Sequence, residues 1–148
     1  MVILIDSREQ LPLEFEVKGN ISKVETIGLL FGDYQAMLED GIVIPISFDR
    51  KTPQDLYATL TSGNERFKRE IERARKHNFT LYLIIEGSIS EILSGVGYSK
   101  IEPDTLIKTL FTFKVKYGVE PIFCNNRSEM KRYIIETFEA FGRSWEKK

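Results

Sequence analysis

The sequence contains one cysteine and one histidine, and this scarcity narrows its possible chemistry. A single cysteine, Cys124, excludes an intramolecular disulfide and a cysteine-rich zinc site. The apolar residues before it predict an inert buried thiol rather than a nucleophile. His77 ends a basic helical segment, which is a common structural position for histidine. The usual nucleophile–histidine pairs therefore have few candidates.

The sequence also lacks a strong net charge and a long apolar run. The formal net charge is −1, so any nucleic-acid-binding surface would have to be a local patch. No stretch is long and apolar enough to cross a membrane, and the first residues do not form a secretory signal, which predicts an intracellular protein. The length of 148 residues predicts a single domain over residues 1–148.

The apolar pattern predicts an α/β fold with a mixed central sheet flanked by helices. Predicted strands cover residues 2–5, 23–29, 34–38, 41–48, 79–85 and Glu120–Cys124. Predicted helices cover Pro53–Leu60, 65–76, 88–93, Pro103–Tyr117 and 128–141. The strands 34–38 and 41–48 are expected to form a hairpin through the turn at 39–41. The last two helices are rich in large apolar side chains, which favours a homodimer through these C-terminal helices.

The stretch from residue 44 to residue 55 combines an apolar run with a dense polar cluster. A carboxylate, a guanidinium and an ammonium stand where the predicted strand ends: Asp49, Arg50 and Lys51. A helix start follows, with Thr52 as the predicted N-cap and Asp55 at a position where a carboxylate favours the helix N-terminus. Fixed charges at such strand–helix corners are typical of sites that handle metals and phosphates.

Other carboxylates also lie at the ends of predicted strands, namely Asp6, Glu9 and Asp33. In a mixed sheet these ends can converge, and a fold keeps clustered carboxylates mainly to hold a cation. Oxygen ligands of this kind suit Mg²⁺ or Mn²⁺, which can polarise a phosphoryl oxygen and activate a water molecule. Lys51 is placed to stabilise negative charge on the phosphate or to orient the water. These residue types are the ones that metal-dependent phosphodiester hydrolysis needs.

A structural interpretation competes at each of these positions. Asp33 follows Gly32 and suits a turn. Asp55 suits a helix-start charge, and Asp49 with Lys51 suits a surface ion pair of little energetic value. The residues alone leave both interpretations open.

Two motifs together resemble the XPF-type (ERCC-four-like) structure-specific endonuclease domain. Gly-Asp-Tyr at 32–34 is followed by Asp-Arg-Lys at 49–51, with three residues before Asp55. The family pattern is Gly-Asp, a variable gap, Glu-Arg-Lys, three residues and Asp. The segments 6–13, 61–70 and 83–87 also resemble parts of that family. The resemblance spans about residues 2–87, with a plausible continuation to the C-terminus.

The resemblance implies a restriction-endonuclease-like core that cuts branched or flapped DNA with Mg²⁺ or Mn²⁺, and hence a role in DNA repair or recombination. Such an enzyme would act in the cytoplasm, at the nucleoid or in the nucleus. The implied catalytic residues are Asp33, Asp49, Lys51 and Asp55. The implied metal-site residues are Asp6, Glu9, Asp33 and Asp49. Family members commonly dimerise, in agreement with the apolar C-terminal helices.

The predicted helix 65–76 is the best DNA-facing candidate. The residues expected to contact phosphates are Arg50, Arg66, Lys68, Arg69 and Arg73. Binding through such residues would weaken steeply with salt. A solvated helix laced with Glu/Arg pairs is the competing interpretation. No feature suggests base-specific readout, which is consistent with recognition of DNA by shape.

Asp49 stands where the family has Glu, so its carboxylate is retracted by about an ångström, which matters for metal geometry. This departure leaves two functions open: a nuclease, or a non-catalytic DNA-binding or scaffold subunit on the same fold. An interaction module without a nucleic-acid role would require that the acidic residues not converge in space. The chain has no room for a helix-hairpin-helix or helicase module besides the expected nuclease domain. The preferred DNA structure, the polarity of cutting and the number of metal ions stay open.

Overall fold

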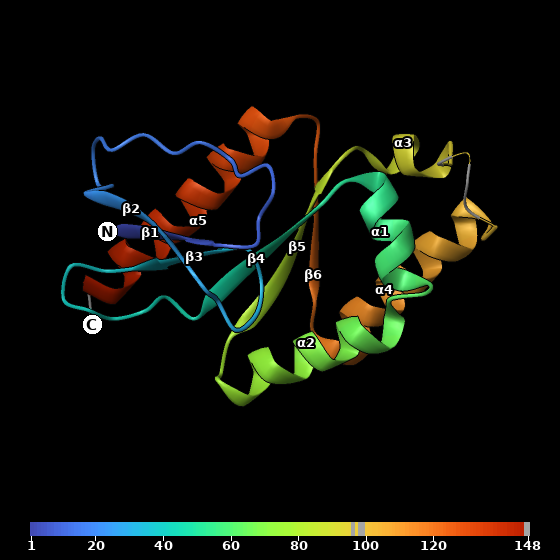
Figure 1. The fold of residues 1–148 in the computed structure, drawn as a ribbon, viewed down its shortest axis with the longest axis horizontal. Helices are drawn as coiled ribbons and strands as arrows, with labels where there is room; N and C mark the ends of the chain where they lie inside the picture. The colour runs from blue at the N-terminus through green and yellow to red at the C-terminus, as the bar shows by residue number, and fades with distance from the viewer. Residues whose placement is uncertain (96, 98–99, 147–148) are drawn as a thin grey trace.

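The computed structural model describes residues 1–95, 97 and 100–146, which fold around one six-stranded sheet (Figure 1). The strands are β1 (Val2–Asp6), β2 (Lys23–Ile27), β3 (Tyr34–Met37), β4 (Ile46–Lys51), β5 (Thr80–Glu86) and β6 (Glu120–Cys124). The helices are α1 (Pro53–Leu60), α2 (Asn64–Lys76), α3 (Ile89–Leu93), α4 (Pro103–Tyr117) and α5 (Arg127–Glu146). The predicted α/β class with a mixed sheet is confirmed.

The strands lie in the order β2-β1-β3-β4-β5-β6. β3 runs antiparallel to both of its neighbours, whereas β1 with β2, and β4 with β5 and β6, are parallel. Parallel neighbours need a crossover. Helices provide it in two cases, since α1 and α2 connect β4 to β5, and α3 and α4 connect β5 to β6, whereas residues 7–22 connect β1 to β2 without a helix.

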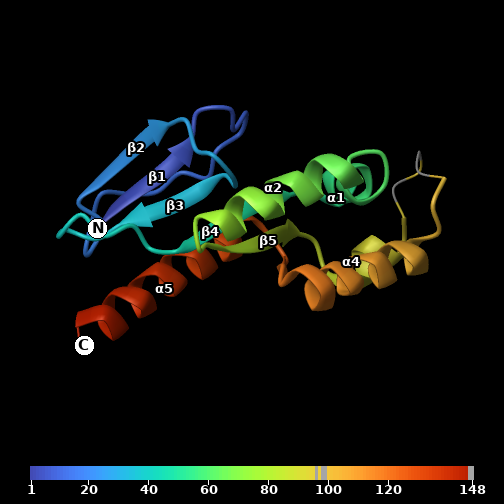
Figure 2. The same cartoon turned by 90° about the horizontal axis from the view of Figure 1, so that it is seen from below.

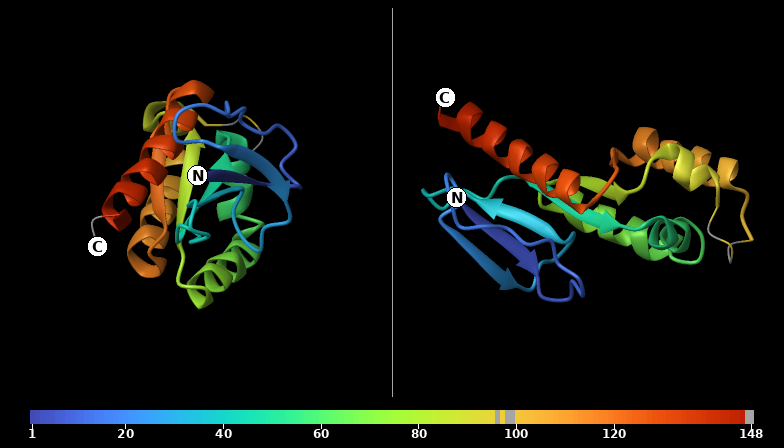
Figure 3. Two further views of the ribbon diagram at one scale, coloured as in Figure 1. Left: turned by 90° about the vertical axis from the view of Figure 1, so that its left-hand side faces the viewer. Right: turned by 90° about the horizontal axis from the view of Figure 1, so that it is seen from above.

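Both faces of the sheet are covered, so the fold has two hydrophobic clusters. Leu83 and Ile85 of β5 belong to the cluster beneath α1, α2 and α4. Ile84, between them, belongs to the opposite cluster with Ile134 and Phe138 of α5. Figure 2 shows α2 and α5 on opposite sides of β4 and β5, and Figure 3 shows α5 running alone along its side. Burial on both faces explains why β5 is an almost continuous apolar run.

The predicted strand 41–48 is wrong in its bounds, because β4 begins at Ile46 and continues through the polar cluster to Lys51. Ile44 still pairs with β3, since its N–H donates to the carbonyl of Ala36 at 2.9 Å. Pro45 has no N–H to continue that ladder, and beyond it the chain runs parallel to β5. The polar cluster therefore lies within the sheet rather than in a loop after it.

α5 is longer than the predicted helix 128–141. It continues through Gly142 to Glu146, and the ring of Phe141 stacks on that of Trp145 at 6.3 Å. Cys124 is buried and His77 ends α2, as predicted. Among the described residues, no helix has both the length and the apolar character needed to span a membrane.

Candidate active site

The ends of β1 and β4 meet the turn before β3 at one edge of the sheet. The N–H of Asp6 donates to the carbonyl of Asp33 at 2.8 Å, and the N–H of Asp33 donates to the carbonyl of Phe48 at 2.7 Å. Since β3 is antiparallel to both neighbours, its first residues lie beside their last ones. This topology brings Asp33 next to Asp49.

Gly32 determines how closely this turn approaches β4. Its φ is +70°, and a Cβ at this position would lie 2.0 Å from the Oγ of Ser47. Any residue larger than glycine would displace the turn. Asp33 is therefore both a turn residue and a member of the acidic cluster, so its two interpretations are compatible.

Three carboxyl groups meet beneath the turn: Asp33, Asp49 and Glu70. Oδ2 of Asp33 accepts a hydrogen bond from the backbone N–H of Arg50 at 2.8 Å. Asp49 is 4% exposed and lies within hydrogen-bonding reach of both Asp33 and Glu70. Its Oδ2 is buried and finds no hydrogen-bond partner within the described part of the chain. A cation or a proton would stabilise negative charge at this oxygen.

Burial raises the pKa of both aspartates. For Asp49 desolvation is the largest cause, and the nearby Glu70 and Asp33 raise the pKa further against the opposing effect of Lys51. For Asp33 the hydrogen bonds with Asp49 and the Arg50 N–H oppose the desolvation, yet the pKa stays raised. The pair therefore holds protons more tightly than free aspartates do when no cation is present.

Lys51 lies against this cluster, with its Nζ 3.6 Å from Oδ1 of Asp49. Its side chain is 19% exposed, so the interpretation as a solvated surface ion pair does not hold. Burial would lower the pKa of Lys51, but the carboxylates of Asp49, Glu70 and Asp33 outweigh it and raise the pKa. The ammonium therefore remains charged at neutral pH, which suits stabilisation of negative charge rather than removal of a proton.

Glu9 and Arg50 form a buried ion pair, although both were predicted to face a ligand. The guanidinium of Arg50 donates to Glu9 at 2.8 and 3.0 Å, and the two side chains are 10% and 8% exposed. The hydroxyl of Tyr34 also donates to Glu9, at 2.7 Å. The two side chains therefore contact each other and do not line the cleft described below, and the metal role of Glu9 and the phosphate role of Arg50 stay predictions.

Two other predicted acids are also engaged in structural contacts. Asp6 accepts hydrogen bonds from the Arg8 side chain at 3.0 Å and from the N–H of Leu29 at 3.0 Å. Asp55 forms a capping box with Thr52 at the start of α1, so its helix-start interpretation is confirmed. The structure thus brings Asp33, Asp49 and Lys51 together, and the roles predicted for Asp6, Glu9 and Asp55 stay predictions.

The cluster lies in an open cleft of about 880 Å³. Three arginines line it: Arg8, Arg66 and Arg73. Of the residues predicted to contact DNA, Arg66 and Arg73 are exposed at this cleft, whereas Lys68 is paired with Glu65 and Arg69 does not line it. The cleft therefore combines a buried acidic floor with a basic rim.

Glu70 is the residue of the site that the sequence analysis missed. It lies on α2, four residues after Arg66 and three residues before Arg73, so the three side chains share one face of the helix. The sequence predicted phosphate contacts for the basic residues of this helix, and no role was assigned to its glutamate. The signal available in the sequence was its spacing from these two arginines, together with the apolar Phe67 and Ile71 close to it on the same helix.

A divalent cation fits the donor chemistry of this cluster. Mg²⁺ and Mn²⁺ prefer carboxylate oxygens, and Oδ2 of Asp49 is a buried oxygen that lacks a partner among the described residues. The carboxyl groups contact one another in pairs, and no three His, Cys, Asp or Glu side chains of the described chain are arranged to hold a metal ion. Asp33 and Asp49 are thus candidate ligands whose oxygens would need to reorient.

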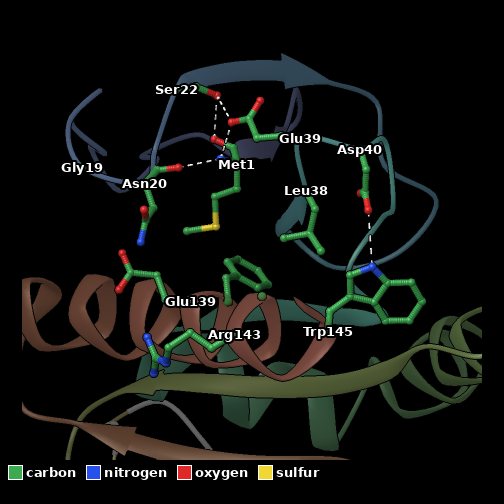
Figure 4. Close-up of a pocket in the computed structure, with 12 residues that line it drawn as sticks. Met1, Gly19, Asn20, Ser22, Leu38, Glu39, Asp40, Glu139, Arg143 and Trp145 are labelled. Atoms are coloured by element: carbon green, nitrogen blue, oxygen red, sulfur yellow. Dashed lines mark hydrogen bonds and ion pairs between the residues drawn. The ribbon is translucent and has the colours of Figure 1, made fainter. Parts of the chain in front are cut away.

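A second cavity, of about 490 Å³, lies near the C-terminal end of α5, between this helix, the N-terminus and the turn after β3 (Figure 4). The amino group of Met1 donates to Glu39 at 2.7 Å, and Ser22 donates to the same carboxylate oxygen at 2.8 Å. The indole N–H of Trp145 donates to Asp40 at 3.3 Å. The Trp145–Asp40 contact joins the end of α5 to the turn after β3, and the contacts to Glu39 join the start of β1 to the same turn. We assign this cavity a structural role.

Comparisons with known proteins place these observations in a family. The ERCC4 domain model matches residues 5–137. The solved structure of XPF from Aeropyrum pernix matches with a TM-score of 0.67 at 19% identity, covering 96% of this chain and 61% of that one. XPF from Aeropyrum pernix in complex with DNA matches with a TM-score of 0.64 at 20% identity, covering 97% and 65%. No curated protein matches the sequence. This chain thus spans less than two thirds of the length of either XPF chain and shares its restriction-endonuclease-like fold.

Proposed function

The chain belongs to the ERCC4 domain family, and from this premise we propose that it is a Mg²⁺- or Mn²⁺-dependent DNA endonuclease. Its substrates would be branched or flapped DNA, and it would act inside the cell. The observation that carries the proposal is the buried ammonium of Lys51 beside Asp33 and Asp49, in a cleft rimmed by arginines.

In this proposal each residue has a role that follows from its position. Asp33 and Asp49 would hold the divalent cation, which when bound polarises the phosphate and lowers the pKa of a water molecule. Asp33 is held in place by the N–H of Arg50, and the Gly32 turn holds it close to β4. Lys51 keeps its proton and would stabilise the negative charge that develops on the phosphate oxygens as water attacks phosphorus and the leaving oxygen departs.

DNA is the partner that the cleft favours. XPF from Aeropyrum pernix, which shares this fold, was solved in complex with DNA. Arg66 and Arg73 would contact phosphates on the two sides of Glu70, and phosphate contacts position DNA without reading its sequence. Selection of DNA by its shape and flexibility at a junction agrees with this arrangement.

A non-catalytic DNA-binding or scaffold subunit is the second candidate. Two observations favour it: Asp49 replaces the family glutamate, and the acidic groups are paired rather than arranged around a common point among the described residues. This candidate predicts DNA binding that is sensitive to salt and is not followed by cleavage. It also predicts that Lys51→Met loses no more affinity than one phosphate contact supplies.

Cleavage of labelled flap, fork and plain duplex DNA with Mg²⁺ or Mn²⁺ tests the proposal. We expect metal-dependent cutting near the junction of the branched substrates, with little cutting of plain duplex and none with EDTA. Binding without cutting on every substrate and with either metal would reject the nuclease and leave the scaffold subunit.

We further propose that residues 1–148 form a single nuclease domain that dimerises through its C-terminal helices. Val115 of α4 is 85% exposed, and Phe111 on the same helix and Tyr133 on α5 are exposed as well. A second copy of the chain could cover these side chains. Sedimentation equilibrium tests this: the wild type should be dimeric and Val115→Lys should shift the equilibrium toward monomer, whereas an unchanged mass would place the interface elsewhere.

A further inference from the structure

We propose that Glu70 of α2 is a third carboxylate ligand of the divalent-cation site, beside Asp33 and Asp49, and that the three side chains reorient around the ion when it binds. This inference rests on the proposed function and adds to it a residue outside the Gly-Asp and Asp-Arg-Lys motifs, to which the sequence analysis gave no role. The three residues come from the turn before β3, from β4 and from α2, and all three line the cleft.

The first support is the contact between Glu70 and Asp49. The two carboxyl groups lie within hydrogen-bonding reach of each other, and Oδ2 of Asp49 is buried without a hydrogen-bond donor among the described residues. Two carboxylates placed together repel each other, so this contact is favourable only with a shared positive charge. A divalent cation between them would supply that charge and use the unpartnered oxygen.

The second support is the way in which Glu70 is held. Its Oε2 accepts a hydrogen bond from the N–H of Gly32 at 3.2 Å, so the side chain is tied to the residue that precedes Asp33. Phe67 and Ile71 are buried beneath α2 and fix the rotation of the helix. Glu70 is therefore oriented toward the turn and not toward solvent, and one carboxylate oxygen remains beyond the Gly32 bond.

The third support is the charge around Glu70. Within the part of the chain that the structure describes, no ion pair joins Glu70 to a Lys or Arg side chain within 4.0 Å. Lys51 places its ammonium 3.6 Å from Oδ1 of Asp49, but one ammonium faces three carboxyl groups. Three carboxylates with one lysine leave an excess of negative charge that matches a divalent cation.

Glu70 also compensates for the shorter side chain of Asp49. The family pattern has a glutamate where this chain has Asp49, so the carboxylate from β4 reaches less far into the cleft. Glu70 has the longer side chain and comes close to Asp49 from α2. Glu70 of α2 would thus bring a carboxylate to the place that the shorter Asp49 side chain of β4 does not reach.

Mn²⁺ binding measured by the electron paramagnetic resonance signal of free Mn²⁺ tests this inference without relying on activity. Glu70→Gln keeps an oxygen for the Gly32 N–H but removes the charge. We expect it to weaken Mn²⁺ binding by about 10- to 100-fold, the scale on which site mutations reduce metal affinity. Glu72→Gln, an exposed neighbour on the same helix, is the matched control and should bind as the wild type does.

A second variant separates a ligand from a merely structural residue. If Glu70 compensates for the short Asp49, then Asp49→Glu in the Glu70→Gln background should recover most of the lost affinity. Glu70→Gln that binds Mn²⁺ like the wild type, while Asp33→Asn does not, would overturn the inference and leave the proposed nuclease intact. A wild type that binds no Mn²⁺ and cuts no DNA would overturn both.

Discussion

Asp49 places a carboxyl group in the protein interior beside two others, and this arrangement costs stability when no cation is bound. We predict that Asp49→Asn stabilises the metal-free protein by about 1–2 kcal/mol at pH 8, the usual size of a single stabilising substitution. The asparagine keeps the shape of the side chain and removes its charge. Urea denaturation in the presence of EDTA provides the measurement.

The pH dependence of this effect follows from the raised pKa of Asp49. An acid whose pKa is raised by folding binds its proton more tightly in the folded state, so it destabilises the fold as the pH rises above the ordinary aspartate value. The advantage of Asp49→Asn should therefore vanish below about pH 3, where the wild-type carboxyl is protonated in both the folded and the unfolded state, and grow toward neutral pH. A variant less stable than the wild type at pH 8 would contradict this view of the site.

The Glu9–Arg50 pair should behave in the opposite way, because each charge has a buried partner. We predict that Glu9→Gln destabilises the fold by about 3 kcal/mol, since it leaves the Arg50 guanidinium without its counter-charge. Thermal or urea denaturation measures the change. Asp104→Asn breaks the exposed Lys108–Asp104 pair and is the control, with an expected change of about 0.5 kcal/mol or less. Equal effects at the two positions would argue against the structural role of Glu9.

At the scale of the elements, the turn before β3 decides whether the acidic cluster forms. We predict that Gly32→Ala destabilises the protein by about 3 kcal/mol and weakens Mn²⁺ binding, because the added Cβ would collide with Ser47 and strain a positive φ. Gly41 has a similar φ of +88°, and an added Cβ there would meet no atom of the described residues within 4 Å, so Gly41→Ala should cost about 1 kcal/mol and leave Mn²⁺ binding unchanged. Denaturation of both variants measures the cost of backbone strain, and Mn²⁺ titration reports whether Asp33 has moved. A smaller loss of stability at Gly32 than at Gly41 would contradict this role of the turn.

The helix α2 packs against the core with one face, and on another face it presents Glu70 to the acidic cluster and arginines to the rim of the cleft. Arg66→Ala and Arg73→Ala should each reduce the slope of log affinity for DNA against log salt by about 0.9, the value for one lost phosphate contact. Arg69→Ala is the matched control, since Arg69 does not line the cleft. DNA binding by fluorescence anisotropy at several salt concentrations gives the slopes. An equal loss for all three variants would mean that the helix binds DNA only through its overall charge.

The sequence predicted most elements well, and its errors have physical causes. β5 and β6 are apolar runs bounded by polar residues, and α1 carries a capping box and a proline at its start, so local patterns sufficed. β4 was misplaced because charged residues such as Asp49 rarely lie inside a sheet. α5 was cut short because Gly142 suggests an end, whereas packing along the sheet carries the helix beyond it.

At the scale of the whole molecule, the sheet brings together residues that are distant in the sequence. Lys51 and Asp49 share one strand, and Asp33 joins them because β3 lies beside β4. The sequence motif therefore predicted this part of the cluster. Glu70 joins through the packing of α2 against β5, which no local pattern shows. The same packing decides that Arg66 and Arg73, rather than Arg69, reach the cleft.

The single-turnover rate of flap-DNA cleavage by Lys51→Met in Mn²⁺ tests whether Lys51 and the carboxylates beside it form the nuclease active site. The wild type should cut, and the variant should cut about 100- to 1,000-fold more slowly while binding DNA with similar affinity, because the lost ammonium stabilises charge only as the phosphate reacts. Lys108→Met, at an exposed position on α4, is the control and should cut like the wild type. Cleavage by Lys51→Met at the wild-type rate would show that the activity does not arise at this site, and the account would fail.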